Sequence, residues 1–156
     1  MCIIICYYLV IIVIFQLWVT GGETEEISTE VVNLATTRQG HDLPWKFSYH
    51  CIAKMDNSDY TKVIIIGGKN YPERTAIGAT RPNGGPYWVA GPNLWQNGGR
   101  VAHSCAHIKH NNGSNYVIVA GGHSFQDIHS TSEILNTDDC DLYDCFRGWY
   151  PGKDFL

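Results

Sequence analysis

The chain has 156 residues, of which 44% are hydrophobic and 17% are charged, so it has enough apolar material for one domain with a core and does not have the composition of a disordered protein. Its net charge is −4 and its Lys and Arg residues do not cluster, which argues against binding to a nucleic-acid backbone. Sixteen Gly, five Trp and nine Tyr, with few amphipathic helical periods, indicate an all-β chain rich in tight turns.

Residues 1–20 are an apolar leader, in which Met1–Val19 carries no charged side chain. The run is long enough for a signal peptide or a signal anchor, and Val19-Thr20-Gly21 is an acceptable sequence around a cleavage site. No basic segment precedes the apolar run, however. Alternatively, Ile12–Thr20 is the first apolar strand of the domain, and cleavage would then remove a strand. A third interpretation is a truncated chain or an incorrect start. We expect membrane contact only through residues 1–20.

An apolar run that ends in two glycines occurs three times along the chain. The pairs are Gly21-Gly22, Gly67-Gly68 and Gly121-Gly122, so they recur after 46 and then 54 residues. The second and third runs each close a predicted β-hairpin, and the two hairpins, CIAKMDNSDYTKVIIIGG and CAHIKHNNGSNYVIVAGG, align without a gap. The alignment makes Cys51 and Cys105 equivalent. A repeat of this period indicates the blades of a propeller.

Two further strand-sized pieces follow the glycine pairs. The first is short, β-branched and carries a Glu, as in Ser28–Leu34 with Glu30 and Thr131–Thr137 with Glu133, whereas the middle block offers only Thr75-Ala76-Ile77. The second has a Trp before a glycine turn: Trp88 with Gly91, and Trp149 with Gly152. The sequence therefore predicts three blocks, residues 17–45, 46–95 and 99–156, each with four short strands.

The apolar run, the glycine pair and the Trp of the repeat each have a physical reason for their position. A run such as Val63–Ile66, apolar throughout, must be buried on both faces, as in strands between packed sheets. A glycine pair permits positive φ and close approach of neighbouring backbone. Trp88 and Trp149 offer large apolar area to the gap between sheets and an indole N–H to a loop carbonyl.

The apolar strand with its glycine pair, the strand with Glu and the Trp before a turn together resemble the Kelch repeat over residues 17–156. The resemblance implies four-stranded antiparallel blades of a β-propeller and a scaffold that binds proteins. The chain departs from the Kelch pattern at Val32 and Leu135, where a tyrosine is often found, and at Thr37, where Trp is expected. Closed propellers use typically four to eight blades, so three blocks predict an incomplete propeller that needs further blades or self-association.

The sequence offers two candidate groups of chemically active side chains. His103, Cys105 and His107 would share one face of a strand, but neighbouring side chains on one strand splay apart and no second cluster supplies ligands, so we expect neither metal nor cofactor. Cys140 and Cys145 are a candidate disulfide that would fit an extracellular setting. Equivalent positions on neighbouring blades should lie about one sheet-packing distance apart, roughly 10 Å, so we expect Cys51 and Cys105 to be free thiols.

Two surface features remain. The acidic segment Asp138–Asp144 is either a solvated loop or a site for a cation or a basic partner, and it lacks the spacing of an EF-hand. Asn112-Gly113-Ser114 is a glycosylation sequon at a predicted hairpin tip, which would matter only in a secreted chain.

The leading functional expectation is a non-catalytic interaction module, secreted or membrane-anchored, that binds a protein or a glycan through unassigned loops at the blade ends. No nucleophile elbow, phosphate loop or zinc-hydrolase motif is present, so the sequence assigns no catalytic residue. One alternative is a fragment of an extracellular copper enzyme similar to galactose oxidase, which would need convergent Tyr, His and Cys. Another is the substrate-receptor part of a ubiquitin-ligase adaptor in the cytoplasm, which would need an additional BTB-like domain.

Overall fold

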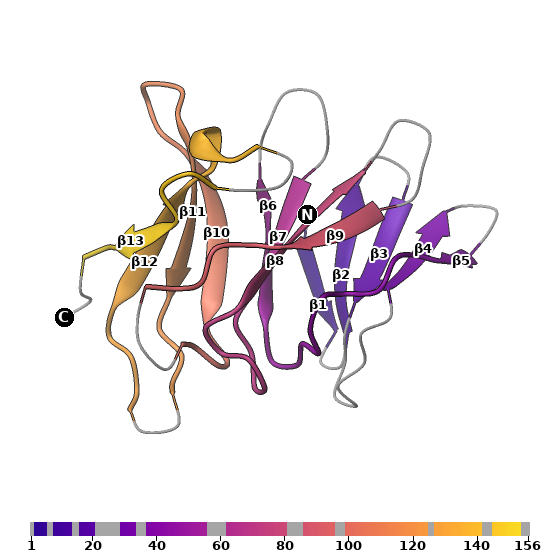
Figure 1. The fold of residues 1–156 in the computed structure, drawn as a ribbon, viewed down its shortest axis with the longest axis horizontal. Helices are drawn as coiled ribbons and strands as arrows, with labels where there is room; N and C mark the ends of the chain where they lie inside the picture. Colours follow the sequence, from indigo (N-terminus) through magenta and orange to yellow (C-terminus); the bar gives the residue numbers. More distant parts are fainter. Residues whose placement is uncertain are drawn as a thin grey trace.

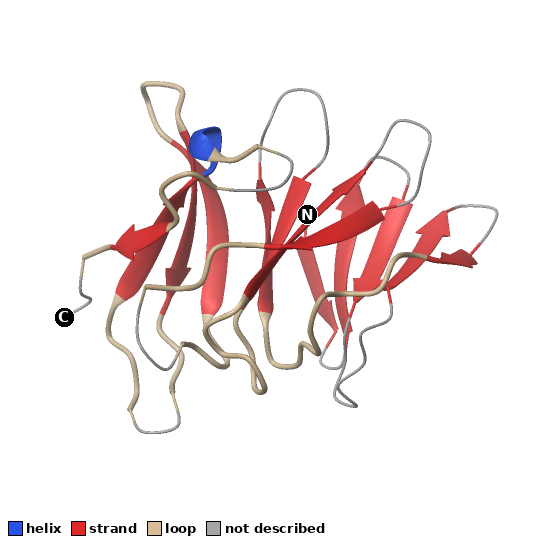
Figure 2. Cartoon of the chain, viewed as in Figure 1, coloured by secondary structure: helices blue, strands red, loops and turns tan. Residues whose placement is uncertain are grey.

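The computed structural model describes residues 2–5, 8–13, 16–20, 29–33, 37–55, 62–80, 86–95, 99–124, 127–141 and 145–153. These residues form an all-β structure of three antiparallel sheets that lie side by side in chain order (Figures 1 and 2). Each sheet is a meander in which every strand pairs with the next one along the chain, and the described strands do not close into a ring. Within the described residues, no helix is long and apolar enough to cross a membrane.

The first sheet has five strands and takes up much of the apolar leader. Its strands are β1 (Cys2–Ile5), β2 (Tyr8–Val13), β3 (Gln16–Thr20), β4 (Thr29–Asn33) and β5 (Thr37–Gln39). The sequence predicted four strands here, with one apolar strand before the first glycine pair. The leader instead supplies three strands, because a long β-branched run with no charge satisfies its backbone groups by folding back on itself. Gly21-Gly22 lie outside the described residues, and cleavage of the leader stays a prediction.

The second and third sheets have the four strands predicted for their blocks. The middle sheet contains β6 (Cys51–Met55), β7 (Lys62–Ile66), β8 (Thr75–Thr80) and β9 (Pro86–Ala90). The third contains β10 (Ser104–Lys109), β11 (Asn115–Ala120), β12 (Ser132–Asn136) and β13 (Trp149–Pro151), with a short 3-10 helix η1 (Thr137–Asp139) after β12. The strand signal at Thr75-Ala76-Ile77, the weakest in the sequence, opens the six-residue β8.

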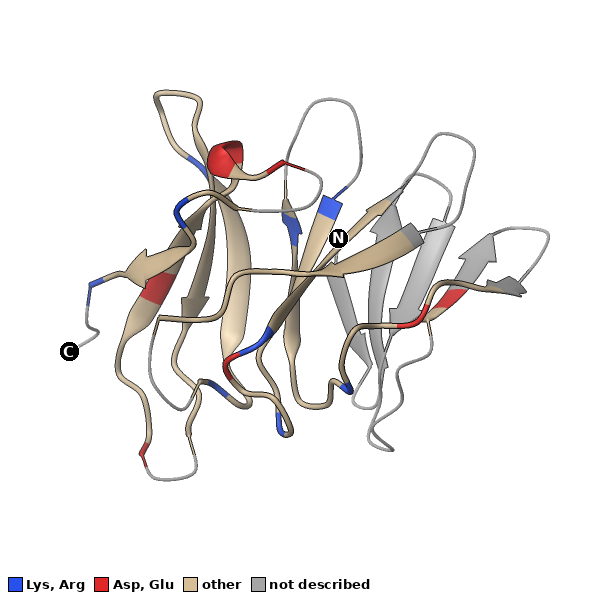
Figure 3. Cartoon of the chain, in the orientation of Figure 1, with Lys and Arg blue, Asp and Glu red and all other residues tan. Residues whose placement is uncertain are grey.

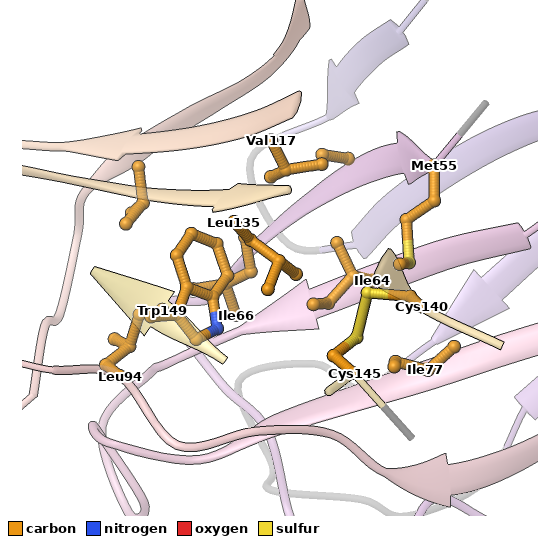
Figure 4. Packing of buried hydrophobic residues seen from close by; sticks show 12 residues of the cluster. Met55, Ile64, Ile66, Ile77, Leu94, Val117, Leu135, Cys140, Cys145 and Trp149 are labelled. Atoms are coloured by element: carbon orange, nitrogen blue, oxygen red, sulfur yellow. A yellow bond between two sulfur atoms is a disulfide. The ribbon is translucent and has the colours of Figure 1, made fainter. Parts of the chain in front are cut away.

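The middle sheet is covered on both faces, as its apolar strand β7 predicted. Ile64 and Ile66 point toward the third sheet and pack with Val117, Leu135 and Trp149 (Figure 4), whereas Val63 and Ile65 point the other way and pack with other apolar side chains, among them Leu43 and Phe47 of the preceding loop and Trp88. The four apolar residues of β7 are all fully buried. Period-two alternation therefore divides one strand between two cores.

Both tryptophans lie in these cores, on the outermost strands of their sheets. Trp149 packs in the core between the middle and third sheets, whereas Trp88 packs on the opposite face of the middle sheet. A Cβ on Gly78 would come within 2.5 Å of the Trp88 ring, so this ring needs a glycine beneath it. The predicted hydrogen bond from the Trp149 indole is wrong within the described residues, where its Nε1 is buried without a partner.

A glycine turn recurs in all three sheets. Gly40, Gly91 and Gly152 donate their backbone N–H to the carbonyls of Thr29, Thr75 and Ser132, which are the first residues of β4, β8 and β12. In the second and third sheets the hydroxyl of that residue donates in turn to a carbonyl after the glycine, at 2.8 Å in both. The three blocks thus share one local geometry, although their sequences differ.

Candidate functional site

The pairing of the cysteines corrects one prediction and bears out another. Cys51 and Cys105 form a disulfide, with 6.0 Å between their Cα atoms, and are not the free thiols that the sequence predicted. They lie on β6 and β10, the first strands of adjacent sheets, which lie next to each other (Figure 1). The sheet-packing distance of roughly 10 Å applies between facing sheet surfaces, not at the side where two sheets converge. Cys140 and Cys145 form the predicted disulfide.

The structure has two ends with different chemistry. Because the strands run antiparallel, Gly67-Gly68, Gly121-Gly122 and the connections between sheets gather at one end, which we call the diglycine end. Its described residues are 47–50, 67–74, 91–95, 99–103, 121–124 and 127–131. The opposite end, which we call the hairpin-tip end, carries the described residues 110–114, 137–141 and 145–148. A β-strand of six residues such as β10 separates the ends by about 20 Å.

Glycines fix the backbone at the diglycine end. Gly67, Gly68, Gly121 and Gly122 all have positive φ, between 55° and 121°. A Cβ on Gly67, Gly68 or Gly122 would come within 2.4 to 2.6 Å of a backbone carbonyl oxygen of a neighbouring segment. The predicted reasons for the glycine pairs, positive φ and close approach, are therefore confirmed in these two blocks.

A buried ion pair behind these glycines joins β12 of the third sheet to the connection between the middle and third sheets. Arg100 is fully buried, and its Nε donates to Oε1 of Glu133 at 2.8 Å. The remaining guanidinium nitrogens donate to the carbonyls of Gly121 and Thr131 and to the Thr131 hydroxyl, and Glu133 also accepts the backbone N–H of Trp95. Glu133 thus has a specific structural role, whereas Glu30, its counterpart in the first sheet, is exposed.

The sequence analysis assigned Glu133 to the repeat motif but did not predict its pairing with Arg100. The signal that could have found it was a charged residue at the start of a block, because an arginine at a crowded, apolar junction between strands needs a carboxylate.

Two histidines lie behind the same end, the buried His103 and the half-buried His50, whose ring nitrogens are buried. His50 and His103 each follow a residue with positive φ, Tyr49 and Ala102, and each precedes the first strand of its sheet. Burial lowers the pKa of each to about 4, and the charge on His103 lowers that of His50 further, whereas backbone groups of Ile66 and Arg100 oppose the shift at His103. Both imidazoles are therefore neutral at neutral pH.

The three residues of the candidate metal cluster have other contacts in the structure. His103 is buried against Gly67, Cys105 is committed to a disulfide and His107 contacts the Asn115 amide at 3.3 Å. Within the described residues, no group of three or more His, Cys, Asp or Glu side chains converges.

The acidic segment at the hairpin-tip end is internally bonded where it is described. Asp138 accepts from the backbone and side-chain amides of Asn115 at 2.9 Å each, and Asp139 accepts from the Asn136 amide at 3.0 Å. Figure 3 shows these acidic residues on η1, with the basic residues scattered elsewhere. Asp144 lies outside the described residues.

A lysine from the middle sheet holds the disulfide loop. The buried Lys62 donates to the backbone carbonyls of Cys140 and Asp141 at 3.1 and 2.8 Å. Burial lowers its pKa, and the Asp141 carboxylate partly offsets this effect. Together with the disulfide, Lys62 fixes the position of this loop against the neighbouring sheet.

Large apolar side chains are exposed mainly at the diglycine end. Tyr49, Tyr71, Trp95 and Ile128 are 56%, 41%, 65% and 90% exposed, and each belongs to a segment of this end. Elsewhere in the described residues, Phe146 at the hairpin-tip end is 88% exposed, and Ile108 and Tyr150 on strands of the third sheet are 43% and 37% exposed. Trp and Tyr are the residues that most often anchor a protein partner, so the diglycine end is the candidate interaction surface.

Comparison with models of known protein families finds none that matches this chain, and comparison with curated proteins finds no match.

Proposed function

We propose that this chain is a Kelch-like, non-catalytic interaction module of an oxidising, extracellular-type compartment, and that it binds a protein partner through the diglycine end. The observation that carries the proposal is the group of exposed side chains Tyr49, Tyr71, Trp95 and Ile128. They stand on a backbone held by the Arg100–Glu133 pair and by positive-φ glycines. A rigid backbone lowers the entropy lost when aromatic anchors become buried against a partner.

The two disulfides support an oxidising, extracellular-type compartment for this chain. Disulfides persist in secreted and surface proteins and are rare where glutathione keeps thiols reduced. This favours an extracellular module over the cytoplasmic adaptor considered from the sequence.

The repeat also supports the presence of a further blade, which would pack on the face of the third sheet that points away from the middle sheet. Ile64 of the middle sheet is fully buried by the third sheet, whereas its counterpart Ile118 on β11 is only half-buried and shares its face with the exposed Ile108 and Tyr150. The occupant that fits such a face is another four-stranded sheet of the same repeat. Sedimentation of the purified chain over a range of concentrations tests this: we expect association that Ile118→Glu weakens, and a monodisperse monomer that melts cooperatively would contradict it.

The partner surface is tested by binding of the purified, disulfide-bonded chain to an array of extracellular proteins, followed by titration of each hit. We expect Trp95→Ala and Tyr71→Ala to weaken binding at least tenfold, since truncation of an interface anchor costs about 2 kcal/mol or more. Phe146→Ala is the matched control, because it removes an equally exposed aromatic ring from the opposite end. If the two diglycine-end variants bind as the unmodified chain does and Phe146→Ala does not, the surface is assigned to the wrong end.

A further inference from the structure

We propose that the side-chain amide of Asn112 is an N-glycosylation site. Asn112-Gly113-Ser114 is the only Asn-x-Ser/Thr sequence in the chain, and its middle residue is not proline. The structure adds three observations: the exposure of the sequon, the orientation of the Asn112 side chain, and a disulfide on one strand of the hairpin that carries the sequon.

The sequon lies at a fully open hairpin tip. It belongs to the turn between β10 and β11, where residues 110–113 are exposed, and a Cβ placed on Gly113 would meet no atom within 4 Å. The turn is closed by hydrogen bonds between the backbones of His110 and Ser114 at 2.8 Å and of Gly113 and His110 at 2.9 Å. A glycosylating enzyme therefore reaches the tip without opening the sheet beneath it.

The side chain of Asn112 is oriented with its amide nitrogen outward. Its Oδ1 accepts the backbone N–H of Ser114 at 3.0 Å and lies 3.0 Å from Nδ1 of His110. Because a backbone N–H can only donate, the atom facing it must be the oxygen, which fixes the orientation of the amide. Within the described residues, Nδ2 makes no hydrogen bond that would have to be broken.

The hairpin also contains evidence for an oxidising compartment, because Cys105 of β10 is bonded to Cys51. Disulfides form in the same secretory compartment in which Asn-x-Ser/Thr sequences are glycosylated. The inference thus rests on the compartment proposed above, but not on the proposed partner surface.

The reaction balances with one co-reactant, an oligosaccharide linked to a lipid diphosphate. Nδ2 of Asn112 attacks the anomeric carbon of the first sugar, and a C–N bond forms while the bond from that carbon to the diphosphate oxygen breaks. The lipid diphosphate leaves with the bonding electrons, and Nδ2 gives up one proton. No oxidation or reduction takes place.

The experiment is secretion of the full chain, with its own residues 1–20, from a eukaryotic cell, followed by intact-mass measurement before and after a peptide-N-glycanase that converts a glycosylated Asn to Asp. We expect a glycan mass that the enzyme removes, leaving an aspartate at position 112. Asn112→Gln and Ser114→Ala should both abolish the glycan, whereas Ser114→Thr should keep it. Asn70→Gln is the matched control, because Asn70 is also exposed but lacks a hydroxyl residue two positions later.

The results distinguish an error in the proposed glycosylation site from an error in the proposed compartment. A secreted chain with both disulfides formed but with Asn112 unmodified would overturn the glycosylation site alone. A chain retained in the cell with reduced thiols would overturn both the site and the proposed compartment.

Discussion

The two disulfides should stabilise the fold by different amounts, and the structure gives the difference. In the chain-entropy account, a crosslink stabilises by restricting the unfolded chain, and its effect grows with the logarithm of the loop that it closes. The Cys51–Cys105 bond spans 54 residues, which corresponds to about 4 kcal/mol, and the Cys140–Cys145 bond spans 5, which corresponds to about 2 kcal/mol. The bond between sheets should therefore contribute about twice as much as the bond within the loop.

The assay is urea unfolding of two double variants, each with and without reductant. Of the two disulfides in the described residues, Cys140→Ala/Cys145→Ala keeps the bond between the sheets, and we expect reductant to lower its unfolding free energy by about 4 kcal/mol. Cys51→Ala/Cys105→Ala keeps the loop bond, and the fall should be about 2 kcal/mol. Each comparison keeps the sequence constant, so lost side-chain volume cancels. Equal or reversed effects would refute the reasoning, because the longer loop would then not restrict the unfolded chain more.

Three further predictions follow from the diglycine end and the hairpin tip. The pKa of His103 is about 4 in the folded chain against an ordinary value of 6.5, so acidification between these values protonates the unfolded chain first and lowers the free energy of unfolding by about 3 kcal/mol. His103→Gln should reduce this loss when unfolding is measured at pH 7 and at pH 4.5. Glu133→Gln should destabilise by about 3 to 5 kcal/mol because it leaves Arg100 buried without a counter-charge, and Arg100→Met added to it should cost less than the sum of the single changes in a double-mutant cycle. Gly122→Ala should lower the melting temperature more than Gly113→Ala, since both glycines have positive φ but only Gly122 has backbone within 2.6 Å of the added Cβ; equal effects would contradict the close-approach argument.

The repeat in the sequence predicted most of the fold because it aligns residues with equivalent backbone geometry. The apolar run Val63–Ile66 predicted a strand buried on both faces, and Gly67-Gly68 predicted positive φ, since each prediction needs only a local property of the residues. The alignment made Cys51 and Cys105 equivalent and therefore did not predict their bond. Cys51 pairs with Ile66, whereas Cys105 pairs with Val119 and not with Ala120, the residue aligned to Ile66, so the two side chains come from opposite faces of their sheets and meet between them.

The candidate interaction surface was much less predictable. The sequence pointed to loops at the blade ends, but nothing in Tyr49, Tyr71, Trp95 or Ile128 distinguishes them from aromatic and aliphatic residues of the core. Trp88 and Trp95 illustrate the point: they lie seven residues apart, yet Trp88 is 9% exposed and Trp95 is 65% exposed. The difference arises because a tertiary contact over Gly78 covers the first ring, whereas the second follows a turn that the ion pair holds at the surface.

The proposed glycan and the proposed partner surface constrain each other. An N-linked oligosaccharide is bulky and strongly hydrated, so a partner that docks beside Asn112 would have to displace or accommodate it. The hairpin-tip end is also the end where Lys62 and the Cys140–Cys145 bond already fix the loops and where Asp138 and Asp139 are engaged within the chain. The exposed aromatic residues of the diglycine end lie about one strand length away, about 20 Å, beyond the immediate reach of the first sugars. Removal of the glycan by Ser114→Ala should therefore leave partner binding unchanged while Trp95→Ala weakens it, and a partner that binds more tightly without the glycan would place the interaction at the hairpin tip instead.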